Sequence, residues 1–388
     1  MPQIAGLRGV LPDPSKLAEV LAAPSDAFAE RLASGALNRD PGRAVYRYHQ
    51  VFELGGRTVT RKALIAAVRL MPWSERQIRA HEESGGRDAA LATIRATGAH
   101  TVPVFAGFRD AAGEVDRQFR KLEGDRPTLQ HTTADGTIHR VFRAQSAEIL
   151  GPLRKVFAPK KLHVLDGHDR YEAMLAYQEE LGAKQALPLY SSANHGLACM
   201  VNLDDPTVYQ TTTARHRIVR GPAVKSAAVL AAAKPWFIID KLAGAAKDQV
   251  ALRAALADSV AHQPAFVIVF AGEPDAYKLT LSPDVSLIDV GVKVHRALQK
   301  LDPVVEALLF RPRALAGATV TTDTDLPRVL AAVQGGAAAA IVMRPMQLDQ
   351  LIHVDELGEL LPAGSTAFFP PVAAGLVMSM VDPDEDLV

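Results

Sequence analysis

The segment from Leu162 to Leu181 constrains the fold of this chain more than any other. An apolar run ends at Leu165, polar or glycine residues follow as far as Arg170, and an amphipathic stretch completes the segment. This order predicts a buried strand, a tight loop and a helix. Gly167 in the loop lets the backbone approach another group closely, where any side chain would block it. A strand that leads directly into a helix is typical of an α/β domain.

Other segments of the chain repeat the alternation between strand-like and helix-like patterns. Alternating or short apolar runs predict strands at 45–52, 101–108, 138–144, 196–203, 265–270, 276–281 and 338–343. Helical spacing predicts helices at 15–37 (interrupted at 23–26), 61–68, 88–97, 223–233, 249–261 and 325–333. Residues 208–219 indicate a strand pair or one bent strand. The whole pattern predicts an α/β fold.

The composition changes after Gly221, where alanine-rich helices begin to alternate with strands. A chain of 388 residues is long enough for two or three domains at roughly 100–200 residues each. We therefore expect one domain at residues 1–220 and a smaller α/β domain at 221–388.

Charge and cysteine content limit the classes of partner. Lys+Arg and Asp+Glu both number 43, and no basic arm is present, so we expect no nucleic-acid partner. Cys199 is the single cysteine, which excludes an intrachain disulfide and is typical of a reducing cytoplasm. We find no signal-peptide pattern and no apolar run of about 18 residues, so we expect a cytoplasmic protein without a membrane partner.

The loop at 166–170 contains the residue types that bind phosphate. The amino end of the following helix offers unpaired N–H groups, and Arg170 adds a guanidinium fork. Asp166 and His168 could move protons or hold a metal such as Mg²⁺. The structural alternatives are that Asp166 is a helix N-cap and that Arg170 forms a surface ion pair with Glu172 or another carboxylate.

Two further carboxylates are candidates for acid–base chemistry. Glu82 follows His81 just before a predicted helix, where it could act as a general base or metal ligand, or could be a solvated helix end. Asp26 follows Pro24 at a turn, where it could instead be a second helix cap.

Polar residues also lie at the ends of predicted strands, where α/β folds often place ligands. Asn194 and His195 precede a buried strand, and His216 alternates with two arginines on another, where it could contact phosphate or be a structural histidine. For Asp204 and Asp205, just after a strand, a plain turn is the favoured interpretation.

Other catalytic motifs are missing from the sequence. We expect no zinc site, because His163 and His168 lack cysteine partners or a second spaced histidine pair. The sequence contains neither a P-loop motif nor a Gly-x-Ser-x-Gly elbow. Cys199 lies within an apolar run and is expected to be inert packing.

Several motifs together resemble one family over nearly the whole chain. The most specific is Val164 to Glu172, which is close to an Asp-Gly-His-His-Arg-Tyr-Glu motif. Others lie at 6–9, 23–26, 81–84, 193–195, 201–206, 215–219, 365–371 and 375–377. On these motifs the chain is identified as a member of domain-of-unknown-function family 1015. It departs from the family pattern at Asp169, Ser25, Pro371 and Arg215.

The Asp-Gly-His-x-Arg loop is also similar to the phosphate-binding corner of ParB/sulfiredoxin-like folds, a superfamily that includes kinases of free L-serine. This resemblance implies a ParB/sulfiredoxin-like, nucleotide-binding domain at residues 1–220, with the second domain completing or covering the cleft.

The same resemblance implies a nucleotide-dependent kinase that phosphorylates a small hydroxyl compound, with free serine the first guess, ATP or ADP as donor and Mg²⁺ as cofactor. The implied residues are Asp166, Glu82 and Asp26 for catalysis, Asp166 for the metal, Gly167, His168, Arg170 and His216 for the nucleotide, and His81, Asn194 and His195 for the substrate.

Asp169 replaces a family histidine with an anion at the mouth of this site. A nucleotide-binding regulatory protein without turnover therefore stays open as an alternative. So do a nucleotide hydrolase and a DNA-associated partition-like protein, although zero net charge argues against the last of these.

Overall fold

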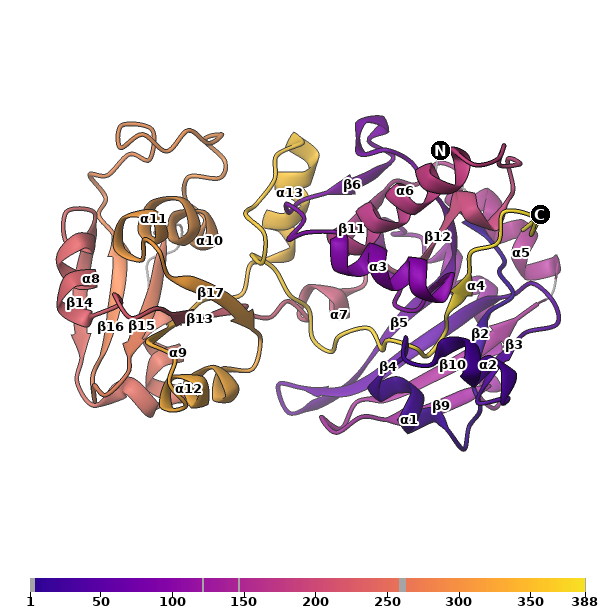
Figure 1. Cartoon of the computed structure of the whole chain (residues 1–388), viewed down its shortest axis with the longest axis horizontal. Coiled ribbons are helices and arrows are strands. Elements are labelled where there is room, and N and C mark those ends of the chain that lie inside the picture. Colours follow the sequence, from indigo (N-terminus) through magenta and orange to yellow (C-terminus); the bar gives the residue numbers. More distant parts are fainter. Residues whose placement is uncertain (1–3, 121, 146, 258–262, 388) are drawn as a thin grey trace. The chain divides into compact units, whose positions relative to one another are not determined.

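The chain folds into two compact units with a mixed α/β architecture (Figure 1). This computed structural model describes residues 4–120, 122–145, 147–257 and 263–387. The first unit comprises Met1–Ala80, Ser84–Thr211 and Phe368–Val388, and the second comprises His81–Glu83 and Thr212–Ala367.

The division differs from the expected boundary at residue 220 in two ways. The boundary lies between Thr211 and Thr212, and the C-terminal segment returns to the first unit. Leu376, Val377 and Met378 are buried there, and Met378 forms an isolated bridge with Val10. The apolar character of this segment therefore serves the core of the first unit rather than that of the second.

One mixed sheet forms the centre of the first unit. Within the described residues its strands run in the order β6 (Ile78–Ala80), β11 (Leu162–Asp166), β8 (Val104–Phe108), β12 (His195–Asn202), β5 (Arg57–Arg69), β4 (Val45–Leu54), β10 (Ile138–Ala144) and β9 (Leu129–Thr132), with β1 (Ile4–Ala5) also paired to β5. Two small sheets join β2 (Val10–Pro12) to β3 (Leu37–Arg39) and β7 (Ala99–His100) to β19 (Ser379–Met380).

Strand directions place several loops at one end of this sheet. β11 runs parallel to β6 and antiparallel to β8, and β12 runs parallel to β8. The carboxyl ends of β6 and β11 and the amino ends of β8 and β12 therefore lie together. We call this the Gly167 end of the sheet.

The predicted helix at 61–68 is wrong, since these residues belong to strand β5. Its side chains from Ala63 to Val68 are all buried, and the strand is hydrogen-bonded to β12 on one side and β4 on the other. Small and β-branched residues suit a central strand that is covered on both faces, and this tertiary burial overrides the helical preference of alanine.

Helices of the first unit are short apart from three. They are α1 (Leu17–Ala22), α2 (Phe28–Ala33), η1 (Trp73–Glu75), α3 (Asp88–Thr97), α4 (Glu114–Phe119), η2 (Leu122–Gly124), α5 (Ala147–Phe157), α6 (His168–Gly182), η3 (Ser192–Asn194) and α7 (Pro206–Tyr209). The helix predicted at 88–97 is confirmed, and the predicted break at 23–26 separates α1 from α2. The strand predicted from residue 208 is wrong at its start, because Pro206 opens a helix there.

The second unit, in orange tones in Figure 1, contains an antiparallel sheet. Its described strands run in the order β14 (Phe237–Leu242), β16 (Ala276–Leu281), β15 (Ala265–Phe270), β18 (Ala339–Val342), β13 (His216–Arg220) and β17 (Thr319–Asp323). Its helical elements are α8 (Ser226–Ala233), η4 (Ala245–Lys247), α9 (Gln249–Ala257), α10 (Asp302–Val304), the π-helical η5 (Val305–Phe310), α11 (Arg311–Ala314), α12 (Leu326–Gln334) and α13 (Leu348–Leu357).

The predicted strands at 265–270 and 276–281 match β15 and β16, and the alanine-rich helices match α8, α9 and α12 in place. Residues 258–261 of the predicted helix lie outside the described residues. Among the helices of the described residues, none has both the length and the hydropathy that a bilayer span requires.

Candidate functional site

The strand, tight loop and helix predicted at 162–181 are confirmed. β11 ends at Asp166 and α6 begins at His168, so the loop is the single residue Gly167. Gly167 has a φ of 90°, in the left-handed region that glycine adopts without steric cost. It is also the N-cap residue, which means that Asp166 is not the cap. Because a glycine cap has no side chain, no capping group of its own occupies the amino end of α6.

The Arg170 guanidinium lies directly over Gly167. A Cβ atom at residue 167 would come within 2.5–2.7 Å of Nη2, Cζ and Nε of Arg170, so a side chain there would displace the guanidinium. Arg170 Nη2 lies 3.6 Å from a carboxylate oxygen of Asp166, so the structural alternative of an ion pair with Glu172 or another carboxylate is met by Asp166. Arg170 Nε is buried and has no hydrogen-bond partner in the described part of the chain. The corner therefore combines a helix amino end with a guanidinium that occupies the space left by the missing side chain of Gly167.

Tyr171, the next residue of α6, fixes this corner to the end of β5. Its hydroxyl donates to the carbonyl of Met71 at 2.8 Å and accepts from the Met71 N–H at 3.0 Å. Its ring packs against Trp73 with centroids 4.5 Å apart. Trp73 is therefore a natural optical probe beside the corner.

The turn that contains Asp26 reaches the same end of the sheet. The Ser25 hydroxyl lies 2.8 Å from that of Thr101. Thr101 precedes Phe105 by four residues, at most roughly 14 Å of chain, and Phe105 faces Asp166 on the neighbouring strand. The Asp26 carboxylate is exposed and does not cap α2, whose N-cap is Ala27. Asp26 is thus free of the structural role that the sequence allowed.

Asn194 ends η3 and His195 begins β12, so both also lie at the Gly167 end of the sheet. Asn194 donates to the carbonyl of Pro188 at 2.7 Å and accepts from Gln178 of α6 at 2.7 Å. His195 Nδ1 lies 2.9 Å from the carbonyl of Ser191, and burial lowers the pKa of His195. Their polar atoms thus support α6 and the segment before β12.

His81 and Glu82 belong to the second unit, where they hold the segment from Gly364 to Thr366. One carboxylate oxygen of Glu82 accepts from the Gly364 N–H at 2.7 Å, and the other accepts from the Thr366 N–H at 2.9 Å and hydroxyl at 2.6 Å. His81 Nε2 lies 3.1 Å from the same hydroxyl. Burial raises the pKa of Glu82, although these hydrogen bonds oppose it. Glu82 is therefore engaged as a buried acceptor.

Two arginines from the predicted motif at 215–219 hold the same segment. Arg215 Nε donates to the carbonyl of Thr366 at 2.7 Å, and Arg217 Nη1 donates to that of Gly364 at 2.6 Å. Arg217 Nε also donates to buried Glu306 at 3.0 Å. Residues 81–83, 215–219 and 365–367 of three predicted motifs are thus brought together within the second unit.

His216 is buried on β13, on the other side of that strand. Its Nδ1 accepts a hydrogen bond from the Met343 N–H at 3.1 Å, and burial lowers the pKa of His216 to about 4. The ring is therefore neutral near pH 7 and supports the backbone where β18 ends.

The other sequence candidates are structural. Asp205 accepts a 2.8 Å hydrogen bond from the Thr207 N–H and caps α7, so it is structural, as a helix cap rather than part of a plain turn. Asp204 accepts from the Asp110 N–H at 2.6 Å at the opposite end of the sheet. Cys199 is fully buried, and burial raises the pKa of its thiol to about 12, so it is a poor nucleophile.

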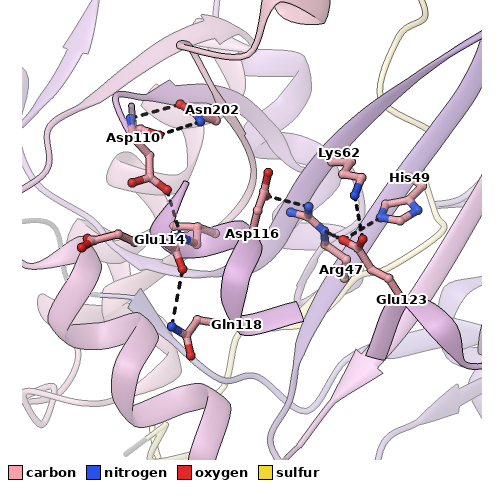
Figure 2. Close-up of polar contacts among 10 residues, drawn as sticks. Arg47, His49, Lys62, Asp110, Glu114, Asp116, Gln118, Glu123 and Asn202 are labelled. Carbon is pink, nitrogen blue, oxygen red and sulfur yellow. Dashed lines mark hydrogen bonds and ion pairs between the residues drawn. The ribbon is translucent and has the colours of Figure 1, made fainter. Parts of the chain in front are cut away.

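A charged cluster that sequence analysis missed surrounds Glu123 (Figure 2). Glu123 pairs with Arg47 and Lys62, each at 2.7 Å, and with His49 at 3.2 Å, while Arg47 also pairs with Asp116 at 2.7 Å. Partial burial would raise the pKa of Glu123, but its hydrogen bonds from His49 and Lys62 hold it well below its usual range. Only alternation along two adjacent strands could have indicated this cluster, since Arg47, His49 and Lys62 face one side.

A preformed metal cage is not found in the described residues, where no group of three His, Cys, Asp or Glu side chains is suitably placed. Asp166 offers one carboxylate that is 46% exposed. Mg²⁺ is commonly held by one or two carboxylates together with substrate phosphates. One exposed carboxylate therefore fits a magnesium ion only if substrate phosphates supply further ligands.

Comparisons with solved structures give distant likenesses. A variant free serine kinase in complex with AMP is 10% identical, with a TM-score of 0.42 and coverage of 80% of this chain and 91% of the other. A conserved hypothetical protein from Pyrococcus furiosus is 10% identical, with a TM-score of 0.39 and coverage of 77% and 90%. SbnI with a C-terminal truncation, from Staphylococcus aureus, is 13% identical, with a TM-score of 0.38 and coverage of 83% and 90%.

No curated protein matches the chain. A family model does match, over residues 8–306, which is most of the chain and includes the Gly167 corner. The family resemblance drawn from the motifs is therefore confirmed, and the chain belongs to the family described as protein of unknown function (DUF1015).

Proposed function

We propose that this protein is a nucleotide-dependent kinase that phosphorylates a small hydroxyl compound, with free L-serine as the first acceptor to test. The Gly167 corner carries the proposal. It joins an α-helix amino end, a glycine in the left-handed region and the guanidinium of Arg170. Backbone N–H groups and the helix dipole favour phosphate at such a position, and an arginine fork adds charge.

In this proposal the nucleotide phosphates bind at Gly167, His168 and Arg170. Asp166 would release its 3.6 Å contact with Arg170 and hold Mg²⁺. The ion would neutralise charge on the transferring phosphoryl group. Arg170 would then be free to turn its fork toward a phosphate, a better partner than one exposed carboxylate.

Transfer would form a bond between the acceptor oxygen and the terminal phosphorus and break the bond from that phosphorus to the bridging oxygen of the nucleotide. ADP leaves when ATP is the donor, and AMP leaves when ADP is the donor. The hydroxyl proton passes to a carboxylate, for which we favour Asp26, because it is exposed at the Gly167 end of the sheet. Both oxygens of Glu82 already accept hydrogen bonds, which makes it the weaker candidate for this base.

The test begins with nucleotide binding. In a Trp236→Phe background Trp73 is the only tryptophan, and it contacts Tyr171 beside the corner. Its fluorescence should change as ATP or ADP with Mg²⁺ is added. Arg170→Ala should weaken the affinity about tenfold or more, as expected for a lost charge-assisted hydrogen bond. Arg57→Ala, at an exposed arginine of β5, is the matched control and should bind like the parent.

Turnover is tested on the full chain with ATP or ADP, Mg²⁺ and a panel of L-serine, L-threonine, L-homoserine and glycerol, by mass spectrometry of the acceptor. A phosphorylated acceptor supports the kinase. Free phosphate without a phosphorylated acceptor would indicate a hydrolase. Equal nucleotide affinity in Arg170→Ala and the parent would refute the corner as the binding site.

Asp169 favours a second candidate, a nucleotide-binding protein without turnover. It places an acidic side chain in the first turn of α6, beside the proposed phosphates. Nucleotide binding that depends on Arg170 but yields no product with any acceptor would select this function.

A further inference from the structure

The second unit contains a cavity of about 500 Å³ that no step of the proposed kinase uses. It lies where β18 ends and α13 begins, and α9 and the start of α10 complete its walls. A volume of this size is within the range of small-molecule sites, roughly 300–1,000 Å³.

Cations dominate the charge of this cavity. Among the described residues, Arg253, Lys300 and Arg344 line it, against the carboxylate of Asp302. Arg344 forms a two-point pair with Asp302 through Nε at 2.7 Å and Nη2 at 2.6 Å. Arg253 and Lys300 are exposed and have no carboxylate partner in the described residues. The positive charge in excess of Asp302 therefore belongs to Arg253 and Lys300.

The lining also includes apolar side chains, among them Leu256, Leu301, Met343 and Met346, and the side-chain amides of Gln347 and Gln350. Methionine side chains adapt to varied apolar groups because they are unbranched and polarizable. A bound molecule would therefore meet both cationic and apolar side chains.

Hydrogen bonds within the protein connect several of the described wall residues. His216 Nδ1 accepts from the Met343 N–H, and the Gln350 side chain accepts from the Gln347 N–H at 2.9 Å. Asp302 also accepts from the Ala265 N–H at 3.0 Å. A preordered cavity costs little ordering free energy on binding.

We infer that this cavity binds a small phosphomonoester that carries an apolar group. A phosphomonoester has a charge of about −1.5 to −2 near pH 7, which matches two unpaired cations better than a monocarboxylate does. The apolar group would pack on Met343 and Met346.

Isothermal titration calorimetry on the full chain tests this inference with phenyl phosphate as the probe. The Arg253→Gln/Lys300→Gln variant should lose at least about tenfold in affinity, from two lost charge-assisted contacts. Lys225→Gln, which changes an exposed lysine of the same unit outside the cavity, is the control and should bind like the parent. Matching thermal unfolding curves will show that all variants are folded.

Other results would overturn the inference. Equal affinity in the double variant would place the probe elsewhere, as would binding that is lost in Arg170→Ala but kept in the double variant. Inorganic phosphate bound as tightly as phenyl phosphate would remove the apolar requirement. Benzoate bound as tightly would remove the preference for a dianion.

Discussion

Two motifs in this chain pair a histidine with a carboxylate: Asp166 with His168, and His81 with Glu82. The two carboxylates have opposite environments in the fold. In the first unit, Asp166 and Arg170 stay partly exposed around a bare helix amino end. In the second unit, Glu82 is buried and accepts hydrogen bonds from Gly364 and Thr366 on both oxygens. The difference teaches that similar residue types can have different roles. In the first unit they are accessible to a ligand, whereas in the second unit they hold a backbone segment in place.

The units can be followed separately, because Trp73 lies in the first and Trp236 in the second. Substituting either tryptophan by phenylalanine leaves a fluorescence probe of one unit. Four predictions use these probes, from the largest expected effect to the smallest.

Acid should destabilise the first unit more than the second. Burial lowers the pKa of His100 and, with opposition from Asp135, that of His139 to about 4 in the first unit. In the unfolded chain these histidines bind protons as the pH falls below about 6.5, whereas in the folded protein they bind them only near pH 4. The free energy of unfolding therefore decreases as the pH is lowered from 6.5 to 4. Each histidine should lower the free energy of unfolding by about 1.4 kcal/mol per pH unit, or by about 6 kcal/mol for both over two pH units.

In the second unit His216 and Glu82 have opposite effects on how stability depends on pH. His216 loses stability over the same range, because burial lowers its pKa. The raised pKa of Glu82 has the opposite sign, since the folded carboxyl binds its proton first as pH falls. Urea unfolding at pH 7 and 4.5, followed by Trp73 or Trp236, measures both slopes. A steeper loss at Trp236 would contradict the prediction.

Removing the Glu82 carboxylate should destabilise the second unit by about 3 kcal/mol, because buried donors of Gly364 and Thr366 lose their acceptor. Glu83→Ala, at the exposed neighbour, should change stability by less than about 0.5 kcal/mol. Urea unfolding followed by Trp236 compares Glu82→Ala with this control. Equal stability of the two variants would show that Glu82 is not structural and make it a catalytic candidate again.

Gly167→Ala should destabilise the first unit by about 2 kcal/mol and weaken nucleotide binding, since its Cβ displaces the Arg170 guanidinium. Gly35→Ala is the matched control, because Gly35 also has a positive φ, of 78°, but open space around its Cβ. It should show the backbone cost alone and keep nucleotide affinity. Trp73 fluorescence reports both quantities, and equal affinity in the two variants would rule out the contact as a determinant of binding.

Asp169→His should strengthen nucleotide binding by less than about tenfold, because it removes a negative charge from the first turn of α6. Asp169→Asn separates loss of charge from gain of a donor. Titration followed by Trp73 measures both. Weaker binding in both variants would show that Asp169 contacts the ligand favourably.

Much of the fold could be predicted where local pattern and tertiary burial agree. Residues 138–144, 265–270 and 276–281 alternate or form apolar runs, and each became a strand with those bounds. The helix predicted at residues 61–68 was wrong, because the helical preference of their alanines is overridden by a central position in the sheet. The return of Leu376–Met378 to the first unit could not be predicted, since no local signal specifies which core an apolar segment joins.

The candidate site residues also fall into two groups: those whose geometry local sequence predicts, and those whose role depends on distant partners. The motif at 166–170 specified its own geometry, because glycine at a strand end before an amphipathic stretch leaves few conformations. Glu82 and His216 were chosen by residue type, but their partners, Thr366 and Met343, lie far away in sequence. Periodicity carries no information about such contacts.

By itself the sequence determined the α/β class, the family and the order of strand, tight loop and helix around Gly167, because these depend on local spacing and backbone freedom. The structure shortened the loop predicted at 166–170 to Gly167 alone. Only the tertiary structure decided which carboxylates stay exposed and which are buried against a backbone segment. The physical reason is that exposure and hydrogen bonding depend on what packs against a residue, and that neighbour comes from elsewhere in the chain.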